Sequence, residues 1–286
     1  MEYEKIEHVA GLVVWYHPEQ SEAEAVRLYA EEVEQVIIVD NSETDHTALA
    51  DTLPNTTYIA CMKNMGIATA LNIGCRKAIE SRAKSVLTMD QDSLWNQQSF
   101  SQYIAEAEAY PEIGKVGIFS PYHDCDGTPE KHRRTGRFEQ RMVQMCSGNL
   151  LRLSAWEAAG GFRDDFFIDL VDDEICCHLW QMGYQVVRLN RINLTHHLGE
   201  GVHRLPITKH PYTPHPVWRY YYIGRNLQRM IQLYPEHSQY YRKHAYKELK
   251  RLCLYDWHNK CQKLSRYLHG WHDGLNPYPT TEQICK

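Results

Sequence analysis

Long apolar runs are absent from this sequence of 286 residues, and none approaches the roughly 18 residues that a membrane-spanning helix requires. The first residues, MEYEKIEHVAGLVVWY, place glutamates before a short apolar run. A secretory signal peptide instead begins with basic residues and continues with a longer apolar stretch. We therefore expect a cytoplasmic protein, either freely soluble or bound peripherally at the inner face of the cell membrane.

Glycine and proline are scarce, with 16 and 12 residues, and the chain contains no low-complexity tract and no internal repeat. These absences exclude a repetitive or low-complexity chain. Hydrophobic residues make up 43% and charged residues 23%, as in a globular protein. The length suffices for one large α/β domain with an appended piece, or for two small domains.

Closely spaced cysteine pairs are also missing: the nine cysteines include no Cys-x-x-Cys motif, and their number is odd. The tightest group, Cys176, Cys177 and His178, has the wrong spacing for a tetrahedral zinc site. We interpret the cysteines as reduced and mostly buried thiols of a cytosolic protein.

The net charge of −5 hides an uneven distribution. Residues 215–270 contain eleven Lys and Arg and three acidic residues, which gives this segment +8 and leaves −13 for the remainder. Four prolines between 205 and 216 mark a linker. We therefore predict two parts with different partners: a main domain over residues 1–205 and a basic, aromatic helical extension over 206–286.

The first part of the chain reads as an α/β sheet. Short, mostly β-branched runs predict strands at 9–15, 36–40, 56–60 and 85–89, and helices are predicted at 21–35, with Ser21 as N-cap, and at 64–80. The resulting order, β-α-β-β-α-β, is typical of nucleotide-binding α/β domains. In such domains the active loops lie beyond the carboxyl ends of the strands.

The remaining elements are mixed. Strands are predicted at 116–119 and 185–189, and a helix at 172–182 ends at Gly183. Ser154 and Glu157 predict a capping box for a short helix that Gly160 and Gly161 end. Beyond the proline-rich linker, amphipathic helices are predicted at about 216–234 and 239–269.

The strongest chemical signal is Asp90-Gln91-Asp92-Ser93, directly after a strand. Two carboxylates at i and i+2 on such a turn can face one hard divalent cation, which would hold a diphosphate by its oxygens. The alternative is an Asx turn with solvated acids.

Two further signals lie at the same predicted edge of the sheet. Asp40 ends a strand, where its carboxylate suits either the N–H of a pyrimidine base or the cap of the following turn; taken singly, the cap is the more common use. Asn64 and Gly66 open a helix whose N–H groups suit a phosphate or ribose. An N-capped helix with a close-packing glycine explains the same residues equally well.

Four carboxylates cluster at a helix N-terminus in Phe167-Ile168-Asp169-Leu170-Val171-Asp172-Asp173-Glu174. Helix stabilisation through the macrodipole needs one or two acids, not four behind an apolar run. A carboxylate in a half-buried loop can act as a general base. His196, at the end of a predicted strand, is usually a satisfied structural residue in such a place, but beside the Asp-x-Asp turn it can complete a metal shell.

Taken in order, these motifs resemble glycosyltransferase family 2, whose fold is of the GT-A type, and within it the bacterial rhamnosyltransferase-like branch. The resemblance runs from about residue 9 to 200. Its strings are VDNS (39–42), NMGIATALNIG (64–74), MDQDS (89–93), SGNL (147–150), GGFRDDFFIDLVDDEICCH (160–178) and HHLG (196–199).

The resemblance implies a role for each motif. It makes Asp172 the general base, with Glu174 orienting the acceptor or supporting the base. It makes Asp92 the ligand of a divalent cation, Mg²⁺ or Mn²⁺, assisted by Asp90 and His196. Contacts to the donor are implied for Asp40 at the base, for Asn64 and Gly66 in the pocket, and for Ser147, Gly148 and Asn149 at its floor. The branch commonly shows Cys-x-Arg after the Asp-x-Glu motif, whereas this chain has Cys176-Cys177-His178, which puts an arginine contact there in doubt.

The expected function is therefore an inverting, metal-dependent transfer of a sugar from a nucleoside diphosphate to an acceptor hydroxyl in bacterial polysaccharide synthesis, without an organic cofactor. The resemblance favours L-rhamnose from dTDP-L-rhamnose, and a UDP-hexose donor remains the alternative. The acceptor is expected to be a glycan or a lipid-linked glycan, with Asp169, Arg225 and Asn226 as candidate acceptor-binding residues.

The basic, aromatic extension is either a helical cap on the main domain or a surface that meets anionic lipid or a lipid-pyrophosphate acceptor. Nucleic acid is not an expected partner, since nothing else in the chain looks like a reader of bases.

Two other classes fit less well. A nucleotidyltransferase needs a glycine-rich basic loop after the first strand, but that position reads Trp15-Tyr16-His17-Pro18-Glu19. An inactive sugar-binding relative is expected to lose its metal or base carboxylates, whereas Asp90, Asp92, Asp172 and Glu174 are all present.

Overall fold

The computed structural model describes residues 5–95, 99–125, 136–196, 203–204, 211–212, 215–254 and 256–276. It divides into two compact units. Unit 1 comprises Met1–Asp165 and Val171–Gly199, and unit 2 comprises Phe166–Leu170 and Glu200–Lys286. Compared with the predicted domains 1–205 and 206–286, this division adds one feature: five residues from the middle of the chain belong with the C-terminal helices.

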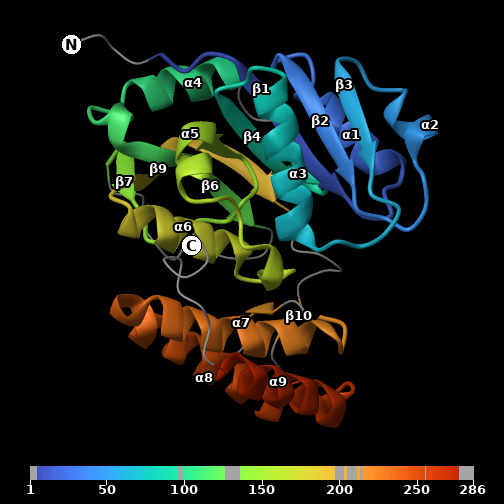
Figure 1. The fold of residues 1–286 in the computed structure, drawn as a ribbon, viewed down its shortest axis with the longest axis vertical. Helices are drawn as coiled ribbons and strands as arrows, with labels where there is room; N and C mark the ends of the chain where they lie inside the picture. The colour runs from blue at the N-terminus through green and yellow to red at the C-terminus, as the bar shows by residue number, and fades with distance from the viewer. Residues whose placement is uncertain are drawn as a thin grey trace. The chain divides into compact units, whose positions relative to one another are not determined.

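Unit 1 is built on a nine-stranded mixed sheet (Figure 1). Its first half is parallel, in the order β3-β2-β1-β4, and consists of β1 (Val9–Trp15), β2 (Gln35–Asp40), β3 (Thr56–Ala60) and β4 (Ser85–Asp90). All seven residues of β1 are buried, because both faces of the parallel sheet are covered, and β-branched side chains suit such strands. All four strands were predicted from the sequence, with bounds that differ by at most one residue.

The second half of the sheet continues from β4 with antiparallel pairing. Strand β8 (Asn149–Arg152) runs antiparallel to both β4 and β6 (Val116–Cys125), and β6 runs parallel to β9 (Gln185–His196). The short strands β5 (Ser93–Leu94) and β7 (Phe138–Gln140) pair antiparallel with β9. Both β6 and β9 are longer than predicted, and the end of β9 pairs with β5, which follows β4 along the chain.

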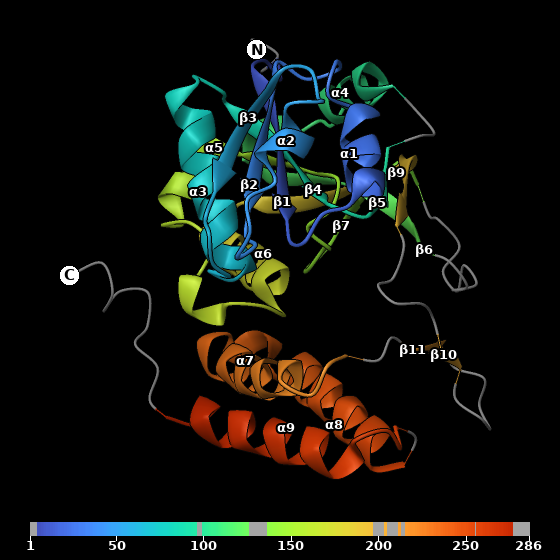
Figure 2. The same ribbon diagram turned by 90° about the vertical axis from the view of Figure 1, so that its right-hand side faces the viewer.

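Helices cover both faces of this sheet (Figures 1 and 2). One face carries α3 (Ile67–Glu80), α5 (Leu153–Ala158) and α6 (Val171–Gln181), and the other carries α1 (Gln20–Arg27) and α4 (Phe100–Glu108). The four-residue helix α2 (Thr47–Ala50) follows β2, and 3-10 turns occur at Ile113–Lys115 and Asp164–Phe166. Helix α3 lies close to the sheet because Gly74 has no side chain: a Cβ there would lie 2.0 Å from Leu12.

Two predicted helix starts were wrong. Helix α1 begins at Gln20 rather than Ser21, because Glu19 and Glu22 form the capping box, and it ends at Arg27 rather than at 35. Helix α5 begins at Leu153 with Arg152 as N-cap and no side-chain cap, so Ser154 and Glu157 form no capping box. Gly160 and Gly161 end it as predicted, with φ values of 75° and 88°. The seven cysteines whose side chains the structure describes form no disulfide.

Unit 2 contains the helices α7 (Arg219–Leu233), α8 (Ser238–Leu254) and α9 (Lys260–Gly274), a 3-10 turn at Pro235–His237 and the two-stranded pair β10 (His203–Arg204) and β11 (Pro211–Tyr212). The single helix predicted over 239–269 is therefore wrong. Asn259 has a left-handed backbone (φ 53°) directly before α9, so α8 and α9 are separate.

Helices α7 and α9 pack backbone against backbone. A Cβ on Gly224 would lie 2.2 Å from the carbonyl oxygen of Tyr267, and one on Gly270 would lie 1.9 Å from that of Tyr221. A buried ion pair between Asp256 and Lys263, 2.9 Å apart, adds to this core. No helix within the described residues combines the length and hydrophobicity that crossing a bilayer requires.

Candidate active site

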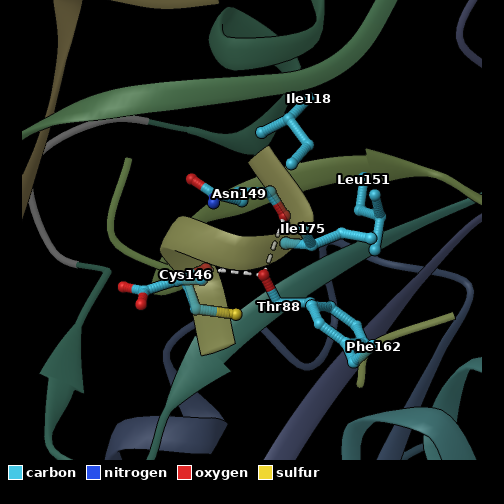
Figure 3. Close-up of a pocket in the computed structure, with 8 residues that line it drawn as sticks. Thr88, Ile118, Cys146, Asn149, Leu151, Phe162 and Ile175 are labelled. Carbon is cyan, nitrogen blue, oxygen red and sulfur yellow. Dashed lines mark hydrogen bonds between the residues drawn. The ribbon is translucent and has the colours of Figure 1, made fainter. Parts of the chain in front are cut away.

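The end of strand β4 is tied to the segment before β8. The hydroxyl of Thr88 donates to the carbonyl oxygens of Cys146 and Asn149 at 2.6 and 3.3 Å (Figure 3), and the amide of Gly148 donates to the carbonyl of Thr88 at 2.6 Å. Gly148 has a φ of 74°, and a Cβ there would lie 2.7 Å from Pro121. The predicted pocket floor therefore lies beside the strand that ends in Asp90.

The Asp-x-Asp turn is held from two sides. The Ser147 hydroxyl accepts from the Asp90 amide at 3.1 Å and donates to the Ser93 hydroxyl at 2.7 Å. On the other side, the Gln91 carboxamide accepts from the Tyr16 amide at 2.7 Å and donates to the Tyr16 carbonyl at 3.3 Å. The turn is thus fixed to the end of β1, while Asp90 and Asp92 are half-buried.

His196 lies next to this turn by strand register. Its backbone pairs with Ser93, the residue that follows Asp92, while its side chain is outside the part of the chain that the structure describes. Among the described side chains, no three His, Cys, Asp or Glu residues are arranged to hold a metal ion. The predicted set of Asp90, Asp92 and His196 therefore stays a prediction.

A small cavity joins this floor to helix α6. Its polar lining comes from Thr88, Cys146, Asn149 and Asp172, apolar side chains including Ile118 and Ile175 complete it, and its volume is only about 10 Å³. Figure 3 shows Cys146, Asn149 and Ile175 gathered around the Thr88 side chain. The carboxamide oxygen of Asn149 is buried and has no hydrogen-bond partner among the described residues, so it is available to a ligand.

Two of the predicted acids act on one sulfur atom. Burial raises the pKa of the Cys146 thiol well above its ordinary value, and the negative charges of Asp90 and Asp172 raise it further. Burial and Asp172 likewise raise the pKa of the Cys176 thiol. In the geometry, Asp172 of the Asp-x-Glu helix shares one cavity of unit 1 with Thr88, two residues before Asp90 on strand β4.

The two acids of the Asp-x-Glu motif differ in exposure. Asp172 is half-buried, and its carboxylate accepts from the Asp173 amide at 3.0 Å. Glu174 has 0% exposure. Of the two roles predicted for Glu174, its burial favours support of the base over direct contact with an acceptor.

Asp40 is 1% exposed and its carboxylate is held on both oxygens. One oxygen accepts from the amide and hydroxyl of Ser42, and the other accepts from Tyr58 Oη at 2.7 Å and faces His46 Nδ1 at 2.6 Å. Burial, together with Asp40, raises the pKa of the Tyr58 hydroxyl. The turn-capping use of Asp40 is thus present, and its contact with a nucleotide base stays a prediction.

Asn64 and Gly66 link the end of β2 to the start of α3. The Asn64 carboxamide oxygen accepts from the Gly66 amide at 3.0 Å and from the Asn41 side chain at 3.1 Å, and Asn41 in turn accepts from the Met65 amide at 2.7 Å. Gly66 is the N-cap of α3, with a φ of 83°. The carboxyl ends of β1, β2 and β4 thereby form one edge, as expected for a parallel sheet.

The candidate acceptor residues Asp169, Arg225 and Asn226 come together within unit 2. Arg219 forms a two-point ion pair with Asp169, and Asn226 and Arg225 both donate to the Phe166 carbonyl, at 2.9 and 3.1 Å. Each candidate therefore already has a partner in the chain, and acceptor binding stays a prediction.

Sequence reasoning missed several residues of the site. Gln91 lies within the Asp-x-Asp motif and Cys146 directly precedes Ser147, so closeness to a motif was the signal that could have identified them. His46 and Tyr58 carry no local signal, because their partner Asp40 is six and eighteen residues away.

The chain is similar to known proteins in sequence and in fold. A family model described as Glycosyl transferase family 2 matches residues 23–171, more than half of the chain. The dTDP-rhamnosyl transferase RfbF of Shigella flexneri is 26% identical over 212 residues, which cover 68% of this chain and 70% of the relative.

Solved structures show the same fold at low identity. GalNAc-T7, crystallised with UDP, GalNAc and Mn²⁺, superposes with a TM-score of 0.55 at 13% identity over 68% of this chain, which spans only 44% of that longer chain. TarS residues 1–349 of S. aureus superpose with a TM-score of 0.54 at 13% identity over 94% of this chain and 73% of theirs. The predicted GT-A fold is thereby confirmed, and the chain belongs to glycosyl transferase family 2.

Proposed function

We propose that this glycosyltransferase moves a sugar from a nucleoside diphosphate to an acceptor hydroxyl in one inverting displacement, with Asp172 as the general base. The observation that carries the proposal is that Asp172 lines one cavity with Cys146 and with Thr88 of the strand that ends in Asp90. One acidic turn is then available for the diphosphate side of the reaction, and a separate carboxylate for the acceptor side.

The proposed displacement takes place in one step and needs no covalent intermediate. The acceptor oxygen forms a bond to the anomeric carbon as its proton passes to the Asp172 carboxylate. The bond from that carbon to the phosphate oxygen breaks, and its electron pair leaves with the nucleoside diphosphate. Because attack and departure occur on opposite faces, the configuration inverts. In the proposed complex, the Asn149 carboxamide oxygen, which has no hydrogen-bond partner among the described residues, accepts a hydroxyl hydrogen of the sugar.

The residues of the Asp-x-Asp turn fit a divalent cation. Asp90 and Asp92 supply carboxylate oxygens, the ligands that Mg²⁺ and Mn²⁺ prefer, and strand register brings His196 beside them. When bound, the cation would neutralise charge on the departing diphosphate as a Lewis acid. The turn itself is pre-shaped by Ser147 and Gln91.

The donor that we propose is dTDP-L-rhamnose, supported by the similarity to a dTDP-rhamnosyl transferase over 70% of that relative's length. The test is a donor screen. The purified protein is incubated with Mg²⁺ or Mn²⁺ and a panel of nucleotide sugars, and thermal stabilisation and slow donor hydrolysis are measured. We expect dTDP-L-rhamnose to give the largest response in wild type. A response to a UDP-hexose alone would refute the rhamnose assignment and leave the glycosyl transfer standing, whereas no response to any donor would refute the proposed transfer.

For the acceptor, we propose a lipid-linked glycan met at an anionic membrane surface through unit 2. Helix α8 presents Lys243, Lys247 and Lys250 on one exposed face at helical spacing, and Tyr246 and Leu254 are 66% and 49% exposed beside them. Interleaved basic and apolar side chains of this kind suit an anionic lipid surface.

The membrane proposal is tested by sedimentation with vesicles that contain an anionic phospholipid. Replacing Lys243, Lys247 and Lys250 by Glu should abolish binding. The matched control replaces the exposed Lys5, Lys63 and Lys84 of unit 1 by Glu and should bind as wild type does. Equal loss in both variants would indicate a net-charge effect, and no binding by wild type would refute the membrane surface.

A further inference from the structure

The segment Phe166–Leu170 has a strained backbone directly before helix α6. Phe167, Asp169 and Leu170 have φ values of 61°, 66° and 61°, in the left-handed region that residues other than glycine rarely adopt. Such conformations persist only where the surroundings hold them, and they concentrate at functional sites. This segment therefore needs an anchor.

Asn226 of helix α7 supplies the first anchor. Its side chain has 0% exposure, and its Nδ2 donates to the carbonyl oxygens of Phe166, Ile168 and Asp169 at 2.9, 2.9 and 2.8 Å. One carboxamide thus binds three carbonyl groups of the segment. Because the carboxamide is buried, no water can replace it at low cost.

Arg219 supplies the second anchor through Asp169. Its Nε and Nη2 donate to the two carboxylate oxygens at 2.9 and 2.8 Å, and the Asp169 side chain is only 14% exposed. Burial raises the pKa of this carboxyl and the Arg219 guanidinium opposes that rise. The planar two-point geometry fixes orientation as well as distance, which a lysine cannot do.

We propose that Asn226 and Arg219 are positioning residues for the general base: by fixing Phe166–Leu170 they set where α6 begins, and with it where the Asp172 carboxylate lies. The inference rests on the proposed function, in which Asp172 takes the acceptor proton. Asp172 follows Leu170 by two residues, so a change in the segment is transmitted along a very short piece of chain. A misplacement of about 1 Å can cost about 10²-fold in rate.

The contacts of the two anchors differ from those that build unit 2. The core of that unit rests on the packing of α7 against α9 at Gly224 and Gly270 and on the buried pair of Asp256 and Lys263. Asn226 and Arg219 instead hold the five residues by which the chain leaves unit 1 and returns to it at Val171. They therefore contact the segment that directly precedes α6 and Asp172, as a positioning role requires.

The test compares Asn226→Ala and Arg219→Lys with Gln232→Ala in the full-length protein. Gln232 is the matched control, because its amide also links α7 to a carbonyl, that of Gly274 at 2.7 Å, far along the chain from the segment. We expect both anchor variants to lower kcat by 10- to 100-fold with the donor KM and acceptor KM within about 2-fold, and Gln232→Ala to keep the kcat of wild type. Arg219→Lys, which keeps the charge, covers the case in which Asn226→Ala does not fold.

Amide hydrogen exchange provides a readout that needs no turnover. Residues 166–174 should exchange at least 10-fold faster in Asn226→Ala than in wild type and in Gln232→Ala. Unchanged exchange there would overturn the inference whatever the activity, and so would a raised acceptor KM at constant kcat, which would indicate acceptor binding instead. If exchange is faster in Asn226→Ala but the wild type transfers no sugar from any donor, the anchoring stands and the proposed function is refuted.

Discussion

Asn72 and Phe162 hold each other by two hydrogen bonds in opposite directions. The Asn72 side chain donates to the Phe162 carbonyl at 2.7 Å and accepts from the Phe162 amide at 2.8 Å. The same carboxamide also meets Trp156 Nε1 at 3.2 Å and Asp164 at 2.8 Å. Helix α3 thereby fixes the chain that leads from α5 toward Asp172.

Substitution of Gly161 is predicted to break this arrangement. Gly160 and Gly161 both have positive φ, so alanine at either position costs about 1 kcal/mol in backbone strain. A Cβ at Gly161 would also lie 2.8 Å from Asn72 Oδ1, whereas one at Gly160 would meet nothing within 4 Å. We therefore expect Gly161→Ala to lower the free energy of unfolding by about 1–3 kcal/mol more than Gly160→Ala, as measured by urea denaturation. Equal losses would show that Asn72 shifts freely.

The Asp172 carboxylate is predicted to carry the proton transfer. Asp172→Asn keeps the shape of the side chain but removes the proton acceptor, so kcat should fall by about 10²-fold or more. Asp173→Asn is the control, since it removes the neighbouring acid of the same helical turn. Steady-state kinetics with saturating donor and acceptor decide the outcome, and wild-type turnover by Asp172→Asn would rule out its role as base.

Much of the parallel half of the sheet was predictable from local pattern. Strands β1 to β4 are short apolar runs, and Asp40 and Asp90 each end one of them, so their meeting at one edge followed from parallel pairing alone. The family motifs then supplied the order of the remaining acids. Helices and strands were predicted correctly where a single hydrophobic periodicity was strong. Helix ends were predicted wrongly where capping depended on a particular side chain, as at Glu19.

The assignment of Phe166–Leu170 to unit 2 was not predictable. Its left-handed residues are Phe167, Asp169 and Leu170 rather than glycine, so no local signal announces the bend. The bend exists because Asn226, nearly sixty positions later, satisfies its carbonyls. The same reason hid Tyr58 and His46, whose partner Asp40 is distant in sequence.

Removal of the Asp92 carboxylate should abolish metal-dependent transfer. A cation at the diphosphate contributes several kcal/mol of charge stabilisation, and each 1.4 kcal/mol is about tenfold in rate. Asp92→Asn should thus lower kcat/KM by at least about 10²-fold, and chelation by EDTA should inactivate wild type until Mg²⁺ or Mn²⁺ is restored. Asp51→Asn, at an exposed acid of unit 1, is the control. Full activity of wild type in EDTA would contradict the metal requirement.

The stability of unit 2 is predicted to fall as the pH is lowered, because of His215. Burial, together with the positive charges of Arg219, Arg251 and Lys263, lowers the pKa of this histidine from 6.5 to about 3, and Asp256 opposes the shift only in part. Below pH 6.5 the unfolded chain therefore binds a proton that the folded protein excludes. The stabilisation is complete above pH 6.5 and is lost progressively as the pH falls toward 3, by at most about 1.4 kcal/mol per pH unit.

Replacing His215 by Gln should flatten that slope. Unfolding of the full-length protein is followed between pH 4.5 and about 7 by urea denaturation, with Trp fluorescence as the signal. His258→Gln, which removes an exposed histidine from the same unit, should keep the pH dependence of wild type. Burial of His178 and His244 also lowers the pKa of each, so part of the slope should survive in His215→Gln. A slope identical to that of wild type would mean that His215 is protonated in the folded protein, and that water reaches the ring between α7 and its buried basic neighbours.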